Sequence, residues 1–204
     1  MTMTVADFDH WEALRPEQAT ELLSGLDVPW YVAAGWAIDL FHGEERREHE
    51  DLEIAVPNAR FGEVAALLDD FDVFVITAPY EATPLSEAAE RMEDTHQTWV
   101  RDPVSGRWRV DFFREPSDGG TWVCRRDTSI SMPYERLIER NPDGIPYGRP
   151  EVVLLFKAKH AHQEKNRADF ADTLPRLGPY RRAWLRDALE RVHPGHEWLG
   201  ELGA

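Results

Sequence analysis

The sequence is poor in cysteine and in long apolar runs, and each shortage excludes a class of protein. Its single cysteine, Cys124, among 204 residues excludes an internal disulfide and is typical of a reducing, cytoplasmic environment. The N-terminal stretch is acidic and lacks the apolar segment of a secretory signal. The longest strongly apolar run, residues 152–156, is too short to span a bilayer. We therefore expect a cytoplasmic protein without a membrane partner.

The chain also has few positive charges. It carries 38 acidic against 23 basic residues, which gives a formal net charge of −15. Such a balance opposes binding to polyanions, so we expect no nucleic-acid partner, and it favours a cationic small molecule. A hydrophobic content of 42% with eight tryptophans indicates an ordered globule. The sequence does not indicate an oligomeric state.

The spacing of apolar and turn residues predicts strands in the first two-thirds of the chain and helices in the last third. We expect helices over 16–26, 36–41, 58–68, 133–140, 150–165 and 180–192, and strands over 30–34, 51–56, 73–76, 97–101, 107–113 and 121–126. Residues 79–94 are expected to form a loop with a short helix, and 141–149 a loop rich in proline and glycine. This order predicts an α+β domain over residues 1–145 and a helical lobe over 146–204.

Two carboxylates alternate with apolar residues in the segment Asp51-Leu52-Glu53-Ile54-Ala55-Val56. In a β-strand, Asp51 and Glu53 project from one face while the apolar residues project from the other. Neighbouring negative charges repel each other unless a cation lies between them, and a divalent metal ion is the usual cation. The alternative is an ordinary pair of acidic residues on a solvated sheet face.

A third carboxylate lies in the strand Trp108-Arg109-Val110-Asp111-Phe112-Phe113. Aspartate is disfavoured in strands, and a charge among aromatic residues is costly unless it is paired or metal-bound. If this strand lies beside the acidic strand, Asp111 completes a triad with Asp51 and Glu53. Three carboxylates together with substrate phosphates suit Mg²⁺, and Asp111 is then also a candidate base for an acceptor hydroxyl.

Two further blocks give the sequence a resemblance to a known family. Residues 34–39 read Ala-Gly-Trp-Ala-Ile-Asp, and Gly43, Arg47, His49, Asp51 and Glu53 follow them. This pattern resembles the aminoglycoside 2''-O-adenylyltransferases of the polymerase-β-like nucleotidyltransferase superfamily. Residues 150–159, with Lys165, Asp169 and Phe170 beyond them, resemble the family's C-terminal segments. Three positions differ from the family pattern: Ala34 replaces a glycine, Glu53 an aspartate, and Asn166 an aspartate.

The resemblance implies a polymerase-β-like mixed sheet with flanking helices, which transfers AMP from Mg²⁺-bound ATP to a hydroxyl. Asp51, Glu53 and Asp111 are then metal ligands, with Asp111 also the base. Gly35 and Trp36 are implied to offer backbone N–H groups to the triphosphate at a helix N-terminus. Arg47 and His49 are implied to approach phosphates or to brace the carboxylates, and Lys157 to neutralise the triphosphate.

The C-terminal lysines and the acceptor site remain open at this level. The helical pattern of residues 152–159 directs either Lys157 or Lys159 towards the nucleotide, without deciding which. Glu93 and Asp94, in an acidic run, are candidate contacts for ammonium groups of a cationic acceptor, or simply solvated residues. Two alternatives to a small-molecule adenylyltransferase are an antitoxin-type enzyme that adenylylates proteins and a nucleotide-binding module without catalysis.

Overall fold

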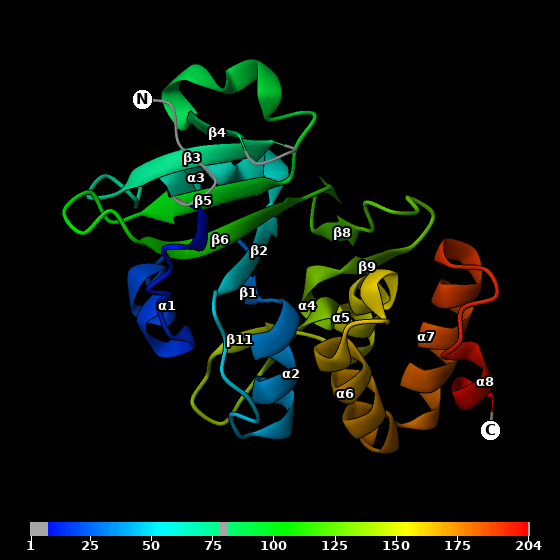
Figure 1. Cartoon of the computed structure of the whole chain (residues 1–204). Coiled ribbons are helices and arrows are strands. Elements are labelled where there is room, and N and C mark those ends of the chain that lie inside the picture. The colour runs from blue at the N-terminus through cyan, green and yellow to red at the C-terminus, as the bar shows by residue number, and fades with distance from the viewer. Residues whose placement is uncertain (1–7, 78–80, 204) are drawn as a thin grey trace. The chain divides into compact units, whose positions relative to one another are not determined.

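Figure 1 shows the protein as a computed structural model that describes residues 8–77 and 81–203. The first residues of the loop expected at 79–94 lie outside this range. Contacts divide the chain into two compact units, one formed by Met1–Val32 and Glu48–Ser117 and the other by Ala33–Arg47 and Asp118–Ala204. The chain therefore enters the second unit early, returns to the first, and leaves it again.

A mixed β-sheet forms the centre of the first unit. Its strands are β1 (Tyr31–Val32), β2 (Glu53–Pro57), β3 (Asp72–Thr77), β4 (Glu81–Pro84), β5 (Gln97–Arg101) and β6 (Trp108–Glu115). They are hydrogen-bonded in the order β1-β2-β6-β5-β3-β4. The pair β2 and β6 is parallel, and the other pairs in this series are antiparallel. The predicted α+β class is confirmed.

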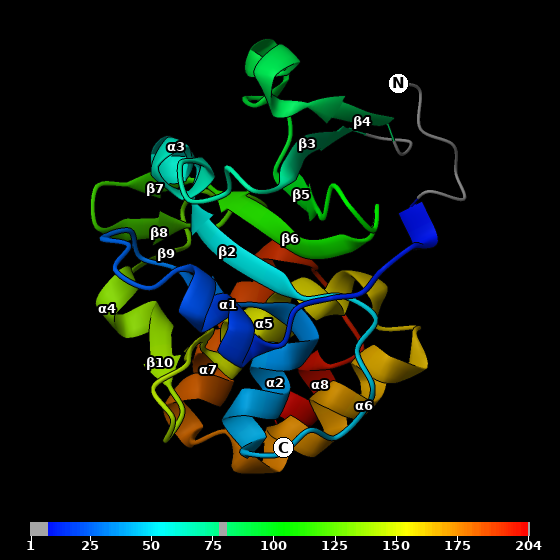
Figure 2. The ribbon, with the colours of Figure 1, turned by 90° about the vertical axis from the view of Figure 1, so that its left-hand side faces the viewer.

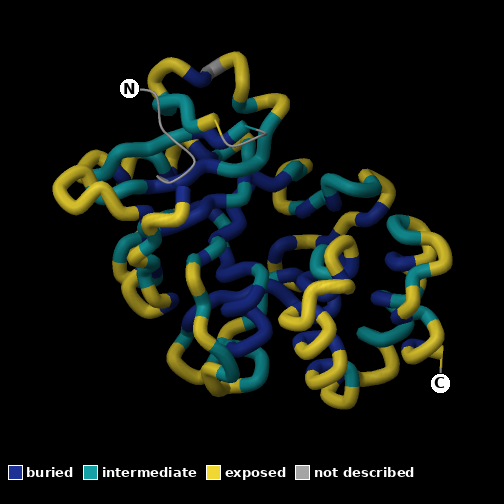
Figure 3. The backbone as a smooth tube through the Cα atoms, viewed as in Figure 1, coloured by how far each residue is buried: buried dark blue, intermediate teal, exposed yellow. Residues whose placement is uncertain are grey.

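The two faces of this sheet are covered differently. On one face, Phe61 of α3 (Phe61–Ala65) meets Phe112 of β6 with ring centroids 6.0 Å apart. On the other face, Phe8 and the half-buried Trp11 pack on Trp99 and Trp108 in an aromatic cluster. Because both faces are covered, the central strands hold many of the buried residues, which Figure 3 colours dark blue.

The remaining elements of the first unit are short. They are α1 (Pro16–Leu22) and the single-turn 3₁₀ helices Asn58–Arg60, Leu85–Glu87 and Ala89–Arg91. Helix α1 begins at a proline, whose missing N–H is not needed in the first turn. The predicted helix at 58–68 is thus a 3₁₀ turn followed by α3. The described part of the segment 79–94, expected to be a loop with a short helix, contains β4 and two 3₁₀ turns.

Helices dominate the second unit, and Figure 2 shows them from a second direction. They are α2 (Ala34–His42), α4 (Tyr134–Leu137), α5 (Pro150–Lys157), α6 (Glu164–Thr173), α7 (Pro179–Val192) and α8 (Leu199–Leu202), with the 3₁₀ turns η5 (Ala158–His160) and η6 (Leu174–Arg176). Helix α5 contacts α2, α6 and α7, so it lies at the centre of this group. The short strands β8 (Thr121–Val123) and β9 (Ser131–Pro133) form one antiparallel pair, and β10 (Ile138–Arg140) and β11 (Pro146–Gly148) form another. The two-residue strand β7 (Ser117–Asp118) lies where the chain leaves the first unit.

Several predicted boundaries differ from the structure for local reasons. The domain boundary expected after residue 145 falls inside the β10–β11 hairpin, where Arg140 pairs with Pro146. The continuous helix expected over 150–165 ends at Lys157, and α6 starts at Glu164. The Asn166 side chain donates hydrogen bonds to the His160 carbonyl (2.9 Å) and to Gln163 Oε1 (3.2 Å), and such bonds compete with helix continuation.

None of the helices within the described part of the chain combines the length and apolar character that crossing a membrane requires.

Candidate active site

Two of the three predicted carboxylates lie opposite each other in the first unit. Glu53 on β2 and Asp111 on β6 are register partners in the parallel pair, and the Asp111 N–H donates to the Leu52 carbonyl at 2.9 Å. Paired residues on adjacent strands project from the same face of a sheet. Asp51 lies two residues before Glu53, just ahead of β2, and is half-buried. The expectation that the two acidic strands are neighbours is therefore met.

Asp111 lies deep in the sheet, with only 3% of its surface exposed. Its cross-strand partner on β5 is Trp99, a member of the aromatic cluster. The Gln97 side chain, two residues earlier on β5, donates a hydrogen bond from Nε2 to Asp111 Oδ2 at 2.7 Å. A hydrogen bond from a neutral donor stabilises an ionised carboxylate and fixes its orientation. Gln97 therefore orients the carboxylate that the sequence indicated as the base.

The donor set of this face suits a hard divalent cation, since carboxylate oxygens are the ligands that Mg²⁺ prefers. Within residues 8–77 and 81–203, no group of three or more His, Cys, Asp or Glu side chains is arranged to hold a metal ion by itself. Protein sites for Mg²⁺ usually supply one or two carboxylates, and substrate phosphates and water complete the coordination. The pair Glu53 and Asp111 supplies two carboxylates on neighbouring strands.

The glycine turn before α2 differs in detail from the prediction. Gly35 and Trp36 lie in the first turn of α2, where backbone N–H groups lack intrahelical acceptors. The left-handed backbone conformation falls on Ala34, with φ +48°, and no other non-glycine residue in the described ranges has a positive φ. A non-glycine residue in this conformation is strained by about 1–2 kcal/mol, and such strain concentrates at functional sites. The strained position is the one where the family pattern has a glycine.

The segment after α2 is tied down by Asp39, a buried residue of that helix. Gly43 ends α2 in the left-handed conformation (φ 80°) and donates its N–H to the Asp39 carbonyl at 2.8 Å. The Asp39 side chain accepts the Arg46 N–H at 3.1 Å through Oδ2. These bonds hold the backbone that carries Arg46 and Arg47 in the second unit. His49 follows in the first unit, half-buried in the irregular stretch before β2.

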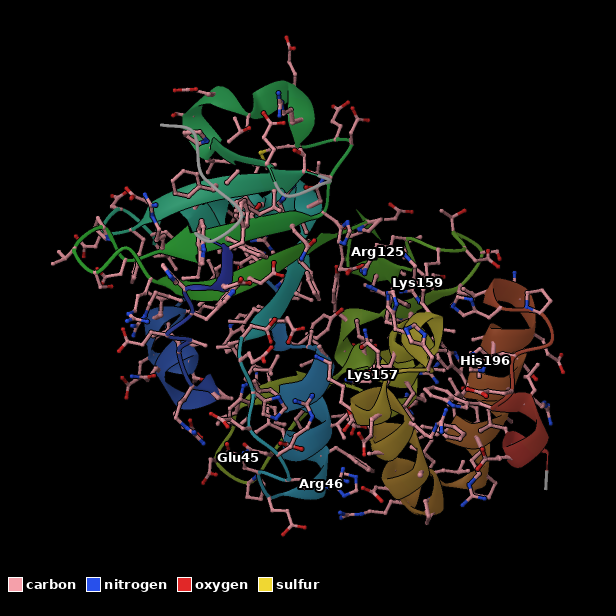
Figure 4. All side chains as sticks on the ribbon, viewed as in Figure 1. Glu45, Arg46, Arg125, Lys157, Lys159 and His196 are labelled. Carbon is pink, nitrogen blue, oxygen red and sulfur yellow. The ribbon has the colours of Figure 1, made fainter. Side chains whose placement is uncertain are left out.

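Lys157, at the end of α5, takes part in a buried charge network within the second unit. Its Nζ lies 2.8 Å from Asp169 Oδ2, and their side chains are only 9% and 5% exposed. Lys157 Nζ also donates to Asn166 Oδ1 at 3.3 Å, and Arg47 Nη2 lies 3.8 Å from the same Asp169 oxygen. Figure 4 labels Lys157, and also Arg46, which is paired with Asp172. Asp169 is thus the ion-pair partner of two of the predicted nucleotide-binding residues, Arg47 and Lys157.

The other predicted residues lie on the surface. Lys159 is exposed in η5, two residues beyond Lys157. Glu93 and Asp94 are exposed in the turn between the last 3₁₀ helix and β5. Lys157 is thus largely buried and Lys159 is exposed, and the role of either lysine at the nucleotide stays a prediction.

Sequence reasoning missed the supporting residues Gln97 and Asp39, and it quoted Asp169 without a role. Gln97 opens a predicted strand, where a polar residue is unremarkable, and only the β5–β6 register brings it to Asp111. A signal for Asp39 was available, because an aspartate four residues before the glycine that ends a helix is well placed to bind the following backbone.

The N-terminal half of the chain matches a described family. The sequence model of the aminoglycoside-2''-adenylyltransferases matches residues 17–106. The resemblance to this family is confirmed. A 2''-aminoglycoside nucleotidyltransferase from Klebsiella pneumoniae is 29% identical over 76 residues, which cover 37% of this chain and 42% of that relative. Sequence similarity to this nucleotidyltransferase thus spans less than half of either protein.

Solved structures extend the similarity of fold to most of the chain. A crystal structure of ANT(2'')-Ia in complex with adenylyl-2''-tobramycin has a TM-score of 0.55 at 14% identity, covering 86% of this chain and 94% of that one. The solution structure of the antibiotic-resistance factor ANT(2'')-Ia has a TM-score of 0.54 at 14% identity and covers 86% and 89%. The lincosamide adenylyltransferase LnuA, bound to lincomycin, has a TM-score of 0.52 at 16% identity, with 84% and 96% covered. The chain therefore has the mixed α+β fold of these antibiotic nucleotidyltransferases.

Proposed function

We propose that the protein is a Mg²⁺-dependent nucleotidyltransferase that transfers AMP from ATP to a hydroxyl of a small molecule. The acceptor that we propose is a cationic antibiotic of the aminoglycoside type or a related metabolite, so that modification would confer resistance. The observation that carries the proposal is the parallel register of Glu53 with Asp111. The match to the adenylyltransferase family over residues 17–106 supports the reaction class.

The proposed roles follow from the chemistry of the side chains. Asp51, Glu53 and Asp111 would bind Mg²⁺, which when bound would neutralise the phosphates and polarise the α-phosphorus. Asp111, oriented by Gln97, would accept the proton of the acceptor hydroxyl. The hydroxyl oxygen then bonds to the α-phosphorus, the bond from that phosphorus to the bridging oxygen breaks, and pyrophosphate leaves.

The nucleotide-binding residues that we propose are Gly35, Trp36, Arg47, His49, Lys157 and Lys159. The acceptor site is proposed to use Glu93 and Asp94, whose carboxylates suit ammonium groups, as does the net charge of −15.

A thermal shift with MgATP tests nucleotide binding directly. A ligand at one hundred times its Kd stabilises a protein by about 2.7 kcal/mol, which for this size raises Tm by roughly 5–10 °C. We expect that shift in the wild type and in the matched control Asp70→Asn, an exposed aspartate of the same unit. Asp51→Asn and Asp111→Asn should lose most of it. An equal shift in Asp51→Asn and in the wild type would count against the proposed metal site.

Pyrophosphate release across a panel of aminoglycosides and lincosamides tests the acceptor. Release that depends on one class identifies the acceptor. Label transferred from ATP to proteins of a lysate would instead favour the antitoxin-type alternative, which the extensive helical unit of this chain disfavours. Binding of MgATP without release for any acceptor or protein would favour the non-catalytic alternative.

A further inference from the structure

A group of basic side chains gathers at one end of α5 in the second unit, although the protein as a whole is strongly acidic. The group comes from the segment after β8, from η5 with the turn that follows it, and from the residue that ends α7. Its members, which we call the cationic cluster, are Arg125, Arg126, Lys159, His160, His162 and His193. Figure 4 labels Arg125 and Lys159, together with the neighbouring His196.

The two arginines are held in place by Phe156 at the end of α5. The guanidinium carbons of Arg125 and Arg126 lie 4.4 Å and 4.7 Å from the centre of the Phe156 ring. Arg126 also donates to the carbonyls of Leu155 and Phe156, at 3.1 Å each, and its Nη1 lies 3.4 Å from His193 Nε2. A cation at the C-terminal end of a helix offsets the helix dipole, so α5 accounts for the position of Arg126. It does not account for Lys159, His160 and His162.

Lys159, His160 and His162 are exposed, and among the described residues none of the three forms an ion pair with a carboxylate. The rings of His160 and His162 lie 6.0 Å apart. Burial first, and then the positive charges of Lys159, His162 and Arg126, lower the pKa of His160. Burial, Arg126, His196 and Lys159 lower the pKa of His193 in the same way. Every charged group that acts on these two histidines is thus a cation or another histidine.

A concentration of like charge costs free energy unless an anion offsets it. The net charge of −15 means that the rest of the chain offers many carboxylates, yet the cluster does not use them at Lys159, His160 and His162. Arginine, lysine and histidine side chains supply several N–H donors at once, a combination that suits the oxygens of a phosphate group. A multiply charged phosphate fits better than a single carboxylate because the donors come from three separate segments.

We propose that the cationic cluster binds a polyphosphate group, either the triphosphate of a nucleotide or free pyrophosphate. The class of ligand rests on the proposed function, in which a triphosphate is consumed and pyrophosphate is released. The existence of the cluster does not rest on it. The inference extends the nucleotide-binding residues beyond Lys159 to His160, His162, His193 and the two arginines.

Calorimetric titration of the full-length protein with sodium pyrophosphate tests the inference without any acceptor. The variant is the triple change Lys159→Gln, His160→Gln and His162→Gln, which alters only exposed side chains and leaves Arg126 on α5. The matched control is Arg167→Gln, which removes one full positive charge from the exposed side of α6. We expect the control to bind pyrophosphate within about twofold of the wild type, and the triple variant at least about tenfold more weakly. No binding by the wild type, or equal affinity of control and triple variant, overturns the inference.

Steady-state kinetics then distinguish the two sources of polyphosphate. A KM for ATP that rises about tenfold in the triple variant, with kcat nearly unchanged, assigns the cluster to the nucleotide triphosphate. An unchanged KM with weaker product inhibition by pyrophosphate assigns it to the leaving product. If the wild type transfers AMP to no acceptor but the triple variant still loses pyrophosphate binding, the proposed function fails while the cluster stands as a polyphosphate site. If transfer occurs and the triple variant changes neither KM nor inhibition, the inference fails alone.

Discussion

Replacing Gln97 with methionine tests whether its hydrogen bond supports the proposed role of Asp111 as a base. The substitution keeps the length of the side chain and removes the donor that lies 2.7 Å from Asp111 Oδ2. A hydrogen bond to a charged group contributes about 1.5–3 kcal/mol, and about 1.4 kcal/mol corresponds to a tenfold change. We therefore expect kcat/KM for AMP transfer to fall by roughly 10- to 100-fold, and the protein to remain folded.

The pH dependence of the rate separates this role from a structural one. A base must be ionised to accept a proton, and loss of the Gln97 donor disfavours the ionised carboxylate. The acid limb of the kcat/KM profile should therefore move to higher pH in Gln97→Met. The measurement is the rate of pyrophosphate release from ATP over a pH range of about two units on either side of neutral.

Gln18→Met provides the matched control, because it makes the same substitution at another glutamine of the first unit whose side chain forms a hydrogen bond. Gln18 accepts the Arg15 N–H at 2.8 Å at the exposed start of α1. Its profile should coincide with that of the wild type. A Gln97→Met enzyme that keeps wild-type kcat/KM at every pH would refute the reasoning, and an equal loss at every pH would reduce Gln97 to a structural residue.

Three further changes test the structure around the site. Ala34→Gly should raise the free energy of unfolding by up to about 1 kcal/mol, because it removes strain at φ +48°, whereas Ala33→Gly, at an extended φ of −111°, should lower it in the same urea titration. Lys157→Met should destabilise the protein by about 3–5 kcal/mol, since it leaves the Asp169 carboxylate buried without this partner. In a double-mutant cycle with Asp169→Asn, the double variant should lose less stability than the sum of the two single losses. Additive losses would mean that the pair is not coupled. Arg114→Met should lower the stability by at least about 3 kcal/mol in thermal unfolding, because the guanidinium donates hydrogen bonds to Asn58, Met92, Thr95 and Thr98. Burial lowers the pKa of Arg114 to about 10. The control Arg107→Met, at an exposed position, should leave the stability unchanged.

The central carboxylate pair was predictable because it depends on a simple pattern. Alternation in the strand of Glu53 and the misfit of Asp111 in an aromatic strand both reflect rules of single strands. Their neighbourhood followed from one assumption, that the two strands are adjacent. Gln97 was not predictable in this way, because its contact depends on the register of a third strand, and a change of one residue would turn the side chain to the other face.

The turn at Ala34 illustrates the limit of residue preferences. Glycine is the residue that most readily adopts a positive φ, so the sequence directed the turn to Gly35. The structure assigns the positive φ to Ala34 instead, and leaves Gly35 within the helix. The contacts of the whole segment outweigh about 1–2 kcal/mol of local preference at one residue, and no local pattern contains those contacts.

The division of the chain into units was hidden because it does not follow the order of the sequence. Residues 33–47 lie between two strands of the first unit, yet α2 packs with α5 and α6 of the second. Trp36, Ala37 and Ile38 of α2 are buried there, and each large apolar side chain that is buried contributes about 1.5–3 kcal/mol. The change of composition near residue 145 marks only the point after which strands become rare. Which unit a segment belongs to depends instead on the segments it packs against. Glu53 and Asp111 thus belong to one unit, whereas Gly35, Trp36, Arg47 and Lys157 belong to the other.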